Sequence, residues 1–66
     1  MRLIVNGDPH EHHGDGTLPV LLKELGADGD RVAVLVNGTV VRKEDRPTRR
    51  LREQDQVEVL VFAGGG

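Results

Sequence analysis

Cysteine, tryptophan and tyrosine are all absent from this chain, and phenylalanine occurs once. Without cysteine there is no disulfide framework, no thiolate nucleophile and no thiolate metal site. No apolar run approaches the ~20 residues that cross a membrane. The opening segment, MRLIVNGD, is too short for a signal peptide. These absences favour a protein of the bacterial or archaeal cytoplasm, with no membrane partner.

The length of 66 residues points to one small domain. A domain of this size buries only about 60% of the surface that its unfolded chain exposes, which leaves no room for a deep substrate cavity. The formal charge of -2, with both signs mixed, argues against broad phosphate-driven binding of nucleic acid. No nucleophile and base are placed as a catalytic set, so a catalytic role is the least favoured function.

The first half of the chain predicts a hairpin and a short helix. Residues 1–5 form a strand-like run that ends at an Asn-Gly turn, and residues 9–13 suit an edge strand because Pro9 cannot donate to a ladder. In the segment 17–26, Thr17 is the predicted N-cap, Pro19 lies in the first turn and Gly26 suits the C′ position. The helix has one apolar stripe, formed by Leu18, Leu21, Leu22 and Leu25.

The second half predicts three more strands. Residues 31–45 form two β-rich runs around Asn37-Gly38, a strong hairpin signal. Residues 46–55 are a polar connection whose one large apolar residue, Leu51, is expected to plug the core, and residues 56–63 form the last strand. The order predicts an α+β domain with a mixed five-stranded sheet and one main helix on one face. We expect this domain to span residues 1–63, followed by a flexible glycine tail at 64–66.

The last strand has two alternating sets of side chains that point to opposite faces. The sets are Val57, Val59 and Val61, and Glu58, Leu60 and Phe62. Because a charged side chain belongs in water, we assign the valines to the helix side and the set with Glu58 to the outside. By the same alternation Leu3 and Val5 point inward in the first strand, whereas Arg2 and Ile4 point outward.

An apolar patch on the open side of the sheet follows if the first and last strands are neighbours. Its members are Ile4, Leu60 and Phe62. Small monomers rarely expose such a patch without using it for a partner. We therefore predict a partner-binding face, with a covering loop as the alternative.

The chain ends in three glycines, Gly64, Gly65 and Gly66. Together they reach at most roughly 10 Å, and ordering them costs on the order of 1–2 kcal/mol per residue, with more for glycine. That cost makes sense where a partner threads bare backbone through a channel too narrow for a Cβ atom. Such a tail delivers the α-carboxylate of Gly66, which adenylation would turn into an acyl donor. A frayed terminus is the alternative.

These segments together resemble the ThiS family, the ubiquitin-like sulfur carriers of thiamine thiazole biosynthesis. The shared features are the MRLIVNG opening, the VAVLVNGTVVRKED hairpin, the L-x-x-x-D-x-V-E-V approach and the Gly-Gly end, and they cover nearly the whole chain. The sequence departs from the family pattern in its extra glycine, Gly64, in Gln54, where the family often has glycine, and in a hairpin exit without an aromatic residue. The resemblance implies a β-grasp fold with parallel first and last strands.

The resemblance also implies a chemistry. A ThiF-type adenylyltransferase, using ATP and magnesium, would adenylate Gly66, with Gly64 and Gly65 threaded into the partner. A persulfide from a cysteine desulfurase or rhodanese-type donor would displace AMP and leave a thiocarboxylate. Thiazole synthase (ThiG) would accept the sulfur. The chain would then be a co-substrate, not an enzyme, monomeric when free and without a bound cofactor.

A histidine cluster raises the question of a metal site. His10 and His12 share a predicted strand face, with His13 opposite. Two imidazoles at i and i+2 can catch a divalent ion, but a structural zinc site needs four ligands. We therefore expect surface histidines with no metal role.

One basic cluster comprises Arg46, Arg49, Arg50 and Arg52. It suits either a solvated loop or a contact with the acidic rim of an activating enzyme, which would speed association. Acidic residues interleave with it and an aromatic stacking platform is missing, so a nucleic-acid partner is poorly supported.

Other functions remain open at this level. Within the same chemistry, the chain could be the small subunit of molybdopterin synthase or a carrier for cysteine or tRNA thiolation. A different class is a protein modifier joined to lysines through Gly66. A third is a non-reactive interaction module that uses the face of Ile4, Leu60 and Phe62. The sequence identifies neither the sulfur donor nor the sulfur acceptor.

Overall fold

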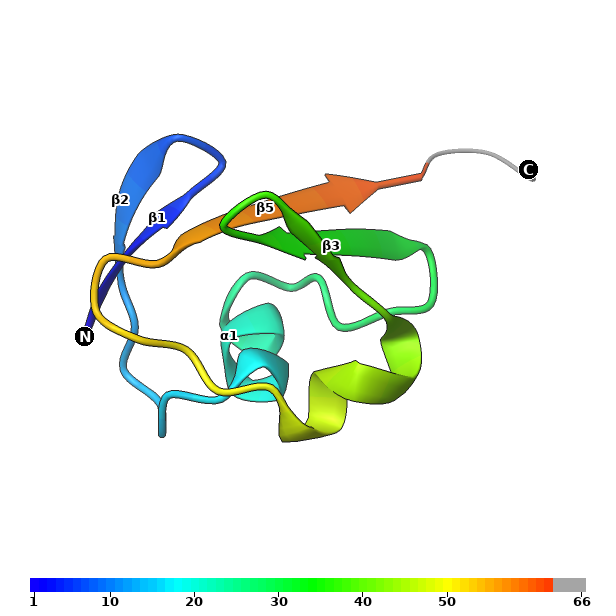
Figure 1. The fold of residues 1–66 in the computed structure, drawn as a ribbon, viewed down its shortest axis with the longest axis horizontal. Coiled ribbons are helices and arrows are strands. Elements are labelled where there is room, and N and C mark those ends of the chain that lie inside the picture. Colours follow the sequence, from blue (N-terminus) through cyan, green and yellow to red (C-terminus); the bar gives the residue numbers. More distant parts are fainter. Residues whose placement is uncertain (63–66) are drawn as a thin grey trace.

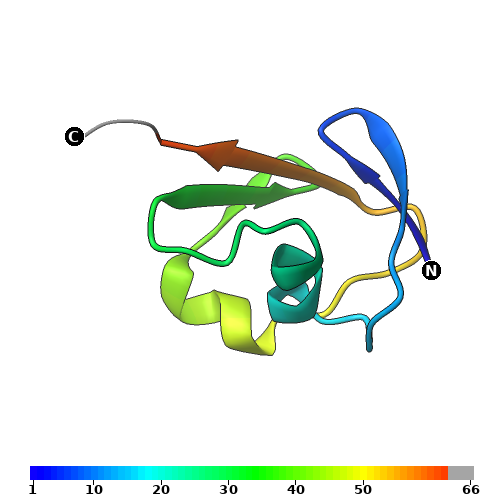
Figure 2. The same cartoon turned by 180° about the vertical axis from the view of Figure 1, so that it is seen from behind.

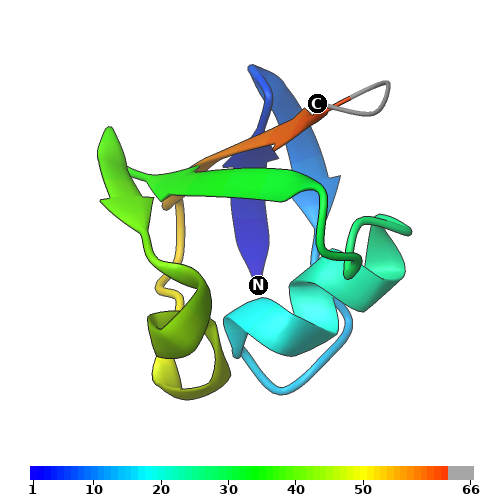
Figure 3. The same ribbon diagram turned by 90° about the vertical axis from the view of Figure 1, so that its right-hand side faces the viewer.

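A five-stranded sheet forms one layer of the structure, and two short helices form the other (Figures 1 and 3). The structure is a computed structural model in which residues 1–62 are described. In chain order the elements are β1 (Arg2–Val5), β2 (Asp8–Glu11), α1 (Leu18–Glu24), β3 (Val32–Val36), β4 (Thr39–Val41), the 3₁₀ helix η1 (Lys43–Thr48) and β5 (Gln56–Val61). The predicted α+β class is confirmed. The predicted boundary between residues 1–63 and the tail at 64–66 lies outside the described residues.

Strand β5 lies at the centre of the sheet, in the order β2-β1-β5-β3-β4 (Figures 1 and 2). It runs parallel to β1, with Ile4 beside Gln56, and antiparallel to β3. The predicted adjacency of the first and last strands is therefore confirmed. Strand β2 is at an edge of the sheet. Pro9 has no N–H to donate, and on its outer side an edge strand pairs with no other strand of the sheet, so proline is tolerated here.

Both hairpin turns are Asn-Gly turns, and both hold β5. Asn6 and Asn37 have φ values of 50° and 52°, as a type I′ turn requires. The Asn6 side chain accepts a hydrogen bond from the Val59 N–H (2.8 Å) and donates to the Val59 carbonyl (3.3 Å). On the other side of β5, the Asn37 side chain accepts from the Gln56 N–H (2.9 Å). The two turns thus anchor the central strand from both of its neighbours.

Helix α1 packs its apolar stripe against the sheet. Leu18, Leu21 and Leu22 are buried, and Leu25 is partly buried against the core. Pro19 lies in the first turn and Gly26 has a φ of 68°, both as predicted. Thr17 occupies the N-cap position, but its hydroxyl donates to Asp15 (2.6 Å) instead of accepting from the helix. Among residues 1–62, no helix is both long and apolar enough to cross a membrane.

The core between the two layers is aliphatic. Its buried members are Leu3, Leu18, Leu21, Leu22, Ala27, Val32, Val34, Val36, Val41, Leu51, Val57 and Val59. Leu51, 5% exposed, plugs the core as predicted. Val57 and Val59 are buried as the alternation predicted, but Val61, which was assigned to the same side, is 68% exposed and is not part of the core. Helix α1 has seven residues, about 10 Å of helix, whereas the six residues of β5 extend about 20 Å, so the helix cannot cover the whole strand.

The helix η1 was not expected from the sequence. The prediction of a β-rich run up to residue 45 is wrong at its end, because β4 stops at Val41 and residues 43–45 belong to η1, which continues into the predicted polar connection. Two contacts fasten it to the start of β3. The Lys43 ammonium pairs with Asp30 at 2.7 Å, and the Arg46 guanidinium donates to the Val32 carbonyl. These contacts hold the polar connection against the sheet without burying any residue of η1.

Candidate functional site

Both helices lie on one side of the sheet (Figure 3), and exposed apolar side chains lie on the other side. Ile4 and Leu60 line the same shallow hollow over β1 and β5. Leu60 is 51% exposed, and Phe62, which directly follows β5, is 58% exposed. Because both side chains are more than half exposed, no loop among residues 1–62 covers them. Their role as a partner-binding face stays a prediction.

Three residues that the sequence reading missed extend this patch. Ala33 lies opposite Leu60 across the β3–β5 pair, and Leu35 lies opposite Val40 across the β3–β4 pair. Val40 is 63% exposed. The alternation in VAVLV, with its valines buried, was the available signal. We call the whole set the outer face: Ile4, Ala33, Leu35, Val40, Leu60 and Phe62.

Strand β5 carries the chain to the end of the molecule farthest from the N-terminus (Figure 1). The Phe62 N–H still donates to the Arg31 carbonyl (2.9 Å), so the pairing with the sheet continues to this residue. The predicted reactive residue, Gly66, and the predicted threading residues, Gly64 and Gly65, lie outside the described residues. The described part of the chain ends at Phe62, which is still paired with the sheet.

The histidine cluster differs from the surface cluster that the sequence predicted. His12 is 3% exposed, and its Nδ1 lies 2.9 Å from Oε1 of Glu24, the last residue of α1. The same oxygen lies 3.1 Å from His10 Nε2, and the other accepts from the His13 N–H (2.9 Å). The Gly16 N–H donates to His12 Nε2 (3.0 Å). That nitrogen is therefore the acceptor, and Nδ1 carries the proton that is donated to Glu24.

The hydrogen bonds around Glu24 give this cluster a structural role. Burial raises the pKa of Glu24, but the bonds from His12, His10 and the His13 backbone outweigh it and lower the pKa from 4.5 to about 2. The carboxylate thus ties β2 and the loop after it to the C-terminal end of α1. Within residues 1–62, no three His, Asp or Glu side chains are arranged to hold a metal ion.

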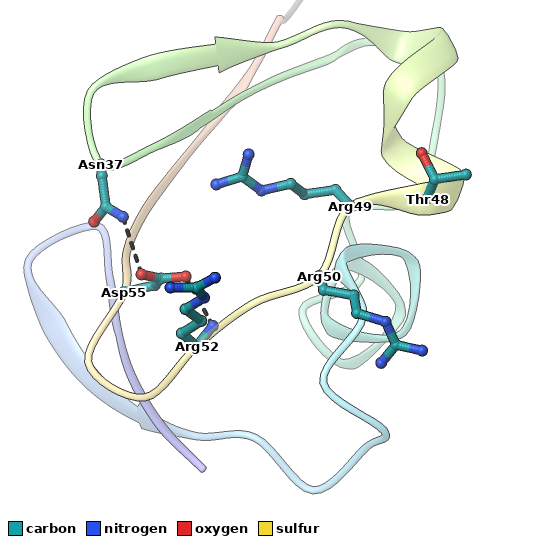
Figure 4. A pocket seen from close by; sticks show the side chains of 6 residues that line it. All are labelled: Asn37, Thr48, Arg49, Arg50, Arg52 and Asp55. Carbon is teal, nitrogen blue, oxygen red and sulfur yellow. Dashed lines mark hydrogen bonds between the residues drawn. The ribbon is translucent and has the colours of Figure 1, made fainter.

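The basic cluster divides into two parts. The Arg46 guanidinium is turned toward β3, where it binds the Val32 carbonyl. The other three arginines line a hollow at the start of β5 (Figure 4). The residues around this hollow are Asn37, Thr48, Arg49, Arg50, Arg52 and Asp55.

The sheet order, the central parallel pair and the helix on one face define the β-grasp fold of ubiquitin-like proteins. A crystal structure described as the thiamine biosynthesis protein ThiS from Geobacter metallireducens matches this chain with a TM-score of 0.82 and 36% identity, over the full length of both chains. The sequence profile of the ThiS family matches residues 3–66. The chain therefore belongs to the ThiS family.

The related proteins carry two kinds of name. "Sulfur carrier protein ThiS" from Thermus thermophilus is 39% identical over 62 residues, which cover 94% of this chain and 95% of the relative. "Thiazole synthase" from Magnetococcus marinus is 41% identical over 66 residues, all of this chain but 20% of the relative. The chain thus spans about a fifth of the length of the thiazole synthases that it matches.

Proposed function

We propose that this chain is a sulfur carrier of thiamine biosynthesis, a protein co-substrate and not a catalyst. The observation that carries the proposal is the match to the ThiS family over residues 3–66, a range that includes the terminal glycines. A relative named as a sulfur carrier, almost fully covered by the alignment, supports the same function. The exposed outer face, as a candidate surface for a partner, and the central position of β5, which leads toward the tail, are consistent with this proposal.

The proposed chemistry takes place on the carboxylate of Gly66. A carboxylate is a poor electrophile, so a ThiF-type adenylyltransferase first transfers AMP from ATP to it, with magnesium, and releases pyrophosphate. A persulfide, supplied by a cysteine desulfurase or rhodanese-type protein, then attacks the acyl carbon and displaces AMP. Cleavage of the resulting acyl disulfide by a thiol leaves a thiocarboxylate. Gly64 and Gly65 contribute the bare backbone that fits a narrow channel.

Thiazole synthase is the proposed sulfur acceptor. In two relatives with that name, from Magnetococcus marinus and Paramagnetospirillum magneticum, the region like this chain is 20% of a longer polypeptide. A carrier domain joined to its acceptor keeps the two at high effective concentration. This supports a direct contact between the present chain and a thiazole synthase. We expect the outer face to make that contact and the one with the adenylyltransferase.

The test is the intact mass of the protein after co-expression with the adenylyltransferase of the same organism. The expected result is a mass gain equal to the replacement of one oxygen by sulfur, mapped to the C-terminal peptide. A variant that lacks Gly65 and Gly66 is the control. It should fold normally and stay unmodified, because its terminal carboxylate, now on Gly64, is two residues too short to reach the adenylation site.

Three outcomes would contradict the proposal. Adducts on lysines of other proteins would indicate a modifier. A mass that stays unchanged with ATP, enzyme and sulfur donor all present would indicate a non-reactive interaction module. A large loss of stability in the truncated variant would mean that the tail is part of the fold.

A further inference from the structure

Most of the positive charge lies in one segment. Six of the nine basic residues lie between Arg42 and Arg52, with only two acidic residues, Glu44 and Asp45, among them. The remainder of the chain carries the other nine of its 11 acidic residues. A weakly acidic protein therefore has one distinctly basic region.

Three of these six cations already have partners. They are Arg42 with Glu44, Lys43 with Asp30, and Arg46 with the carbonyl of Val32. In the part of the chain that the structure describes, no carboxylate forms an ion pair with the guanidinium of Arg49, Arg50 or Arg52. These three arginines are all exposed.

The three arginines are part of the lining of the hollow at the start of β5 (Figure 4). Arg49 extends into the space between the β3–β4 hairpin and the connection, Arg52 lies beside Asp55, and Arg50 points away from both. Both oxygens of Asp55 are engaged elsewhere: Oδ1 accepts from Asn37 Nδ2 (2.9 Å) and Oδ2 from the Arg52 backbone N–H (2.8 Å). The Asp55 carboxylate thus shapes the hollow. Hydrogen bonds from Thr17 lower the pKa of Asp15, and the charge of Arg50 also helps to lower it. This leaves Arg49 and Arg52 as the two guanidinium groups best placed for another anion.

We propose that Arg49 and Arg52, flanked by Arg50, dock against an acidic patch on a protein partner. A guanidinium matches a carboxylate in a two-bond geometry, and unpaired charges at an interface mainly speed association. The hollow lies at the opposite end of β5 from Phe62, roughly 20 Å away by strand rise. In this proposal a single partner contacts the chain at two separate places. One is the outer face together with the tail, and the other is the hollow lined by Arg49 and Arg52.

The charge distribution favours a protein partner over a nucleic acid. A nucleic-acid groove needs cations that follow a backbone and aromatic rings on which bases stack. Here the cations form a compact group, the rest of the chain is acidic, and the one aromatic residue, Phe62, lies at the other end of β5. That the partner is the adenylyltransferase rests on the proposed function, whereas the preference for carboxylates does not.

The first experiment tests the preference for carboxylates on the full chain. Arginine Nε–H signals are followed by NMR while a hexaglutamate peptide, or a DNA strand of the same charge, is added at one ionic strength. The peptide should shift the signals of Arg49 and Arg52 at lower concentrations than those of Arg2 and Arg42, and should bind more tightly than the DNA. Equal shifts at all four arginines, or tighter binding of the DNA, would overturn the proposal.

The second experiment measures association with the adenylyltransferase of the same organism by stopped flow. R49Q/R52Q is compared with K23Q/R42Q, which has the same net charge. The first variant should slow association about tenfold at low salt, a difference that disappears near about 1 M salt. The control should stay within about twofold of the unchanged protein.

The two failures can be told apart. Equal association rates for the two double variants would overturn the docking site while leaving the carrier function intact. The opposite result is an unmodified mass in the co-expression experiment together with preferential binding of the peptide at Arg49 and Arg52. It would overturn the proposed function but would still support a carboxylate-binding site.

Discussion

At the scale of single residues, the most informative position is Gln54. Its φ is 69°, in the left-handed region, and its N–H donates to the Arg2 carbonyl (2.7 Å). The turn before β5 needs a positive φ at this position, which costs a residue with a Cβ roughly 1–2 kcal/mol, and this would account for the glycine that the sequence reading expected here. The departure from the family pattern is therefore a local strain and leaves the fold unchanged.

Replacing Gln54 with glycine should stabilise the protein. Relief of the strain exceeds the extra backbone entropy of glycine in the unfolded chain, so we expect a gain of about 0.5–1 kcal/mol in the free energy of unfolding. Urea denaturation measures this difference. Gln54→Ala is the control, because alanine removes the side chain but keeps the strain. Equal stabilities of the glycine and alanine variants would show that φ is not the cause.

Glu24 is expected to make the stability of the protein depend on pH. Its folded pKa of about 2 is below the ordinary 4.5, so the unfolded chain binds more protons between these values and stability falls as the pH is lowered through that window. Glu24→Gln should be less stable than the unchanged protein by about 2 kcal/mol at pH 7. The difference should shrink toward pH 2, where about half of the Glu24 side chains in the folded protein are protonated.

Unfolding curves from pH 7 to 2 test this prediction, with the exposed Glu58→Gln as the matched control. The control should follow the unchanged protein throughout. A Glu24→Gln deficit that stays constant down to pH 2 would mean that the charge of Glu24 is not what binds the histidines.

At the scale of elements, β5 is connected to the rest of the sheet through side chains as well as through backbone pairing. It is the central strand, and it is held by side chains from both hairpin turns as well as by its two neighbours. Asn6 in particular offers both an acceptor and a donor to the backbone of Val59. An Asn-Gly turn is preferred for its backbone conformation, but here the amide group has this second use.

Asn6→Asp should therefore destabilise the sheet although aspartate also suits the turn. Aspartate keeps the acceptor but loses the donor, and it places a carboxylate near the Val59 carbonyl, so we expect a loss of about 1–2 kcal/mol. Amide exchange at Val59 should become faster. Asn6→Gly is the control that keeps the φ and loses both bonds without adding charge. An Asn6→Asp variant as stable as the unchanged protein would show that the donor to the Val59 carbonyl contributes little.

At the scale of the whole molecule, the two faces of the sheet differ in cover. Helices pack on one face, while the outer face is open over β1, β5, β3 and β4 (Figure 3). Phe62 and Val61 are adjacent, similarly exposed and on opposite sides of the sheet, with 58% and 68% of their surfaces exposed. They form a natural pair for testing which side a partner uses.

Phe62→Asp should weaken binding to the adenylyltransferase by at least about tenfold, because exposed aromatic residues at interfaces are often binding hot spots. Its stability should change by less than about 1 kcal/mol. Val61→Asp, the control, should bind nearly as the unchanged protein does. Isothermal titration calorimetry and urea denaturation separate the two effects. Equal losses of affinity in both variants would contradict the assignment of the outer face.

The helix α1, the five strands and both hairpins could be predicted from the amino-acid sequence, whereas the helix η1 could not. Periodicity gave α1 and the buried valines, the Asn-Gly pairs gave both hairpins, and Leu51 was recognised as a core residue because it stands alone in a polar connection. These signals are local, since each depends on backbone preference or on alternation within one segment. The same alternation predicted Leu60 and Phe62 as exposed, which the structure confirms.

Contacts between groups that are distant in the sequence became visible in the folded structure alone. It joined His12 to Glu24, placed the Asn6 amide on Val59 and gathered Arg49 and Arg52 around one hollow. It also exposed Val61, since a two-turn helix is shorter than the strand it covers. Such contacts depend on the lengths of whole elements and on the angles at which they pack, so they cannot be predicted from the residue pattern within one segment. The physical division is between local backbone preference and long-range packing.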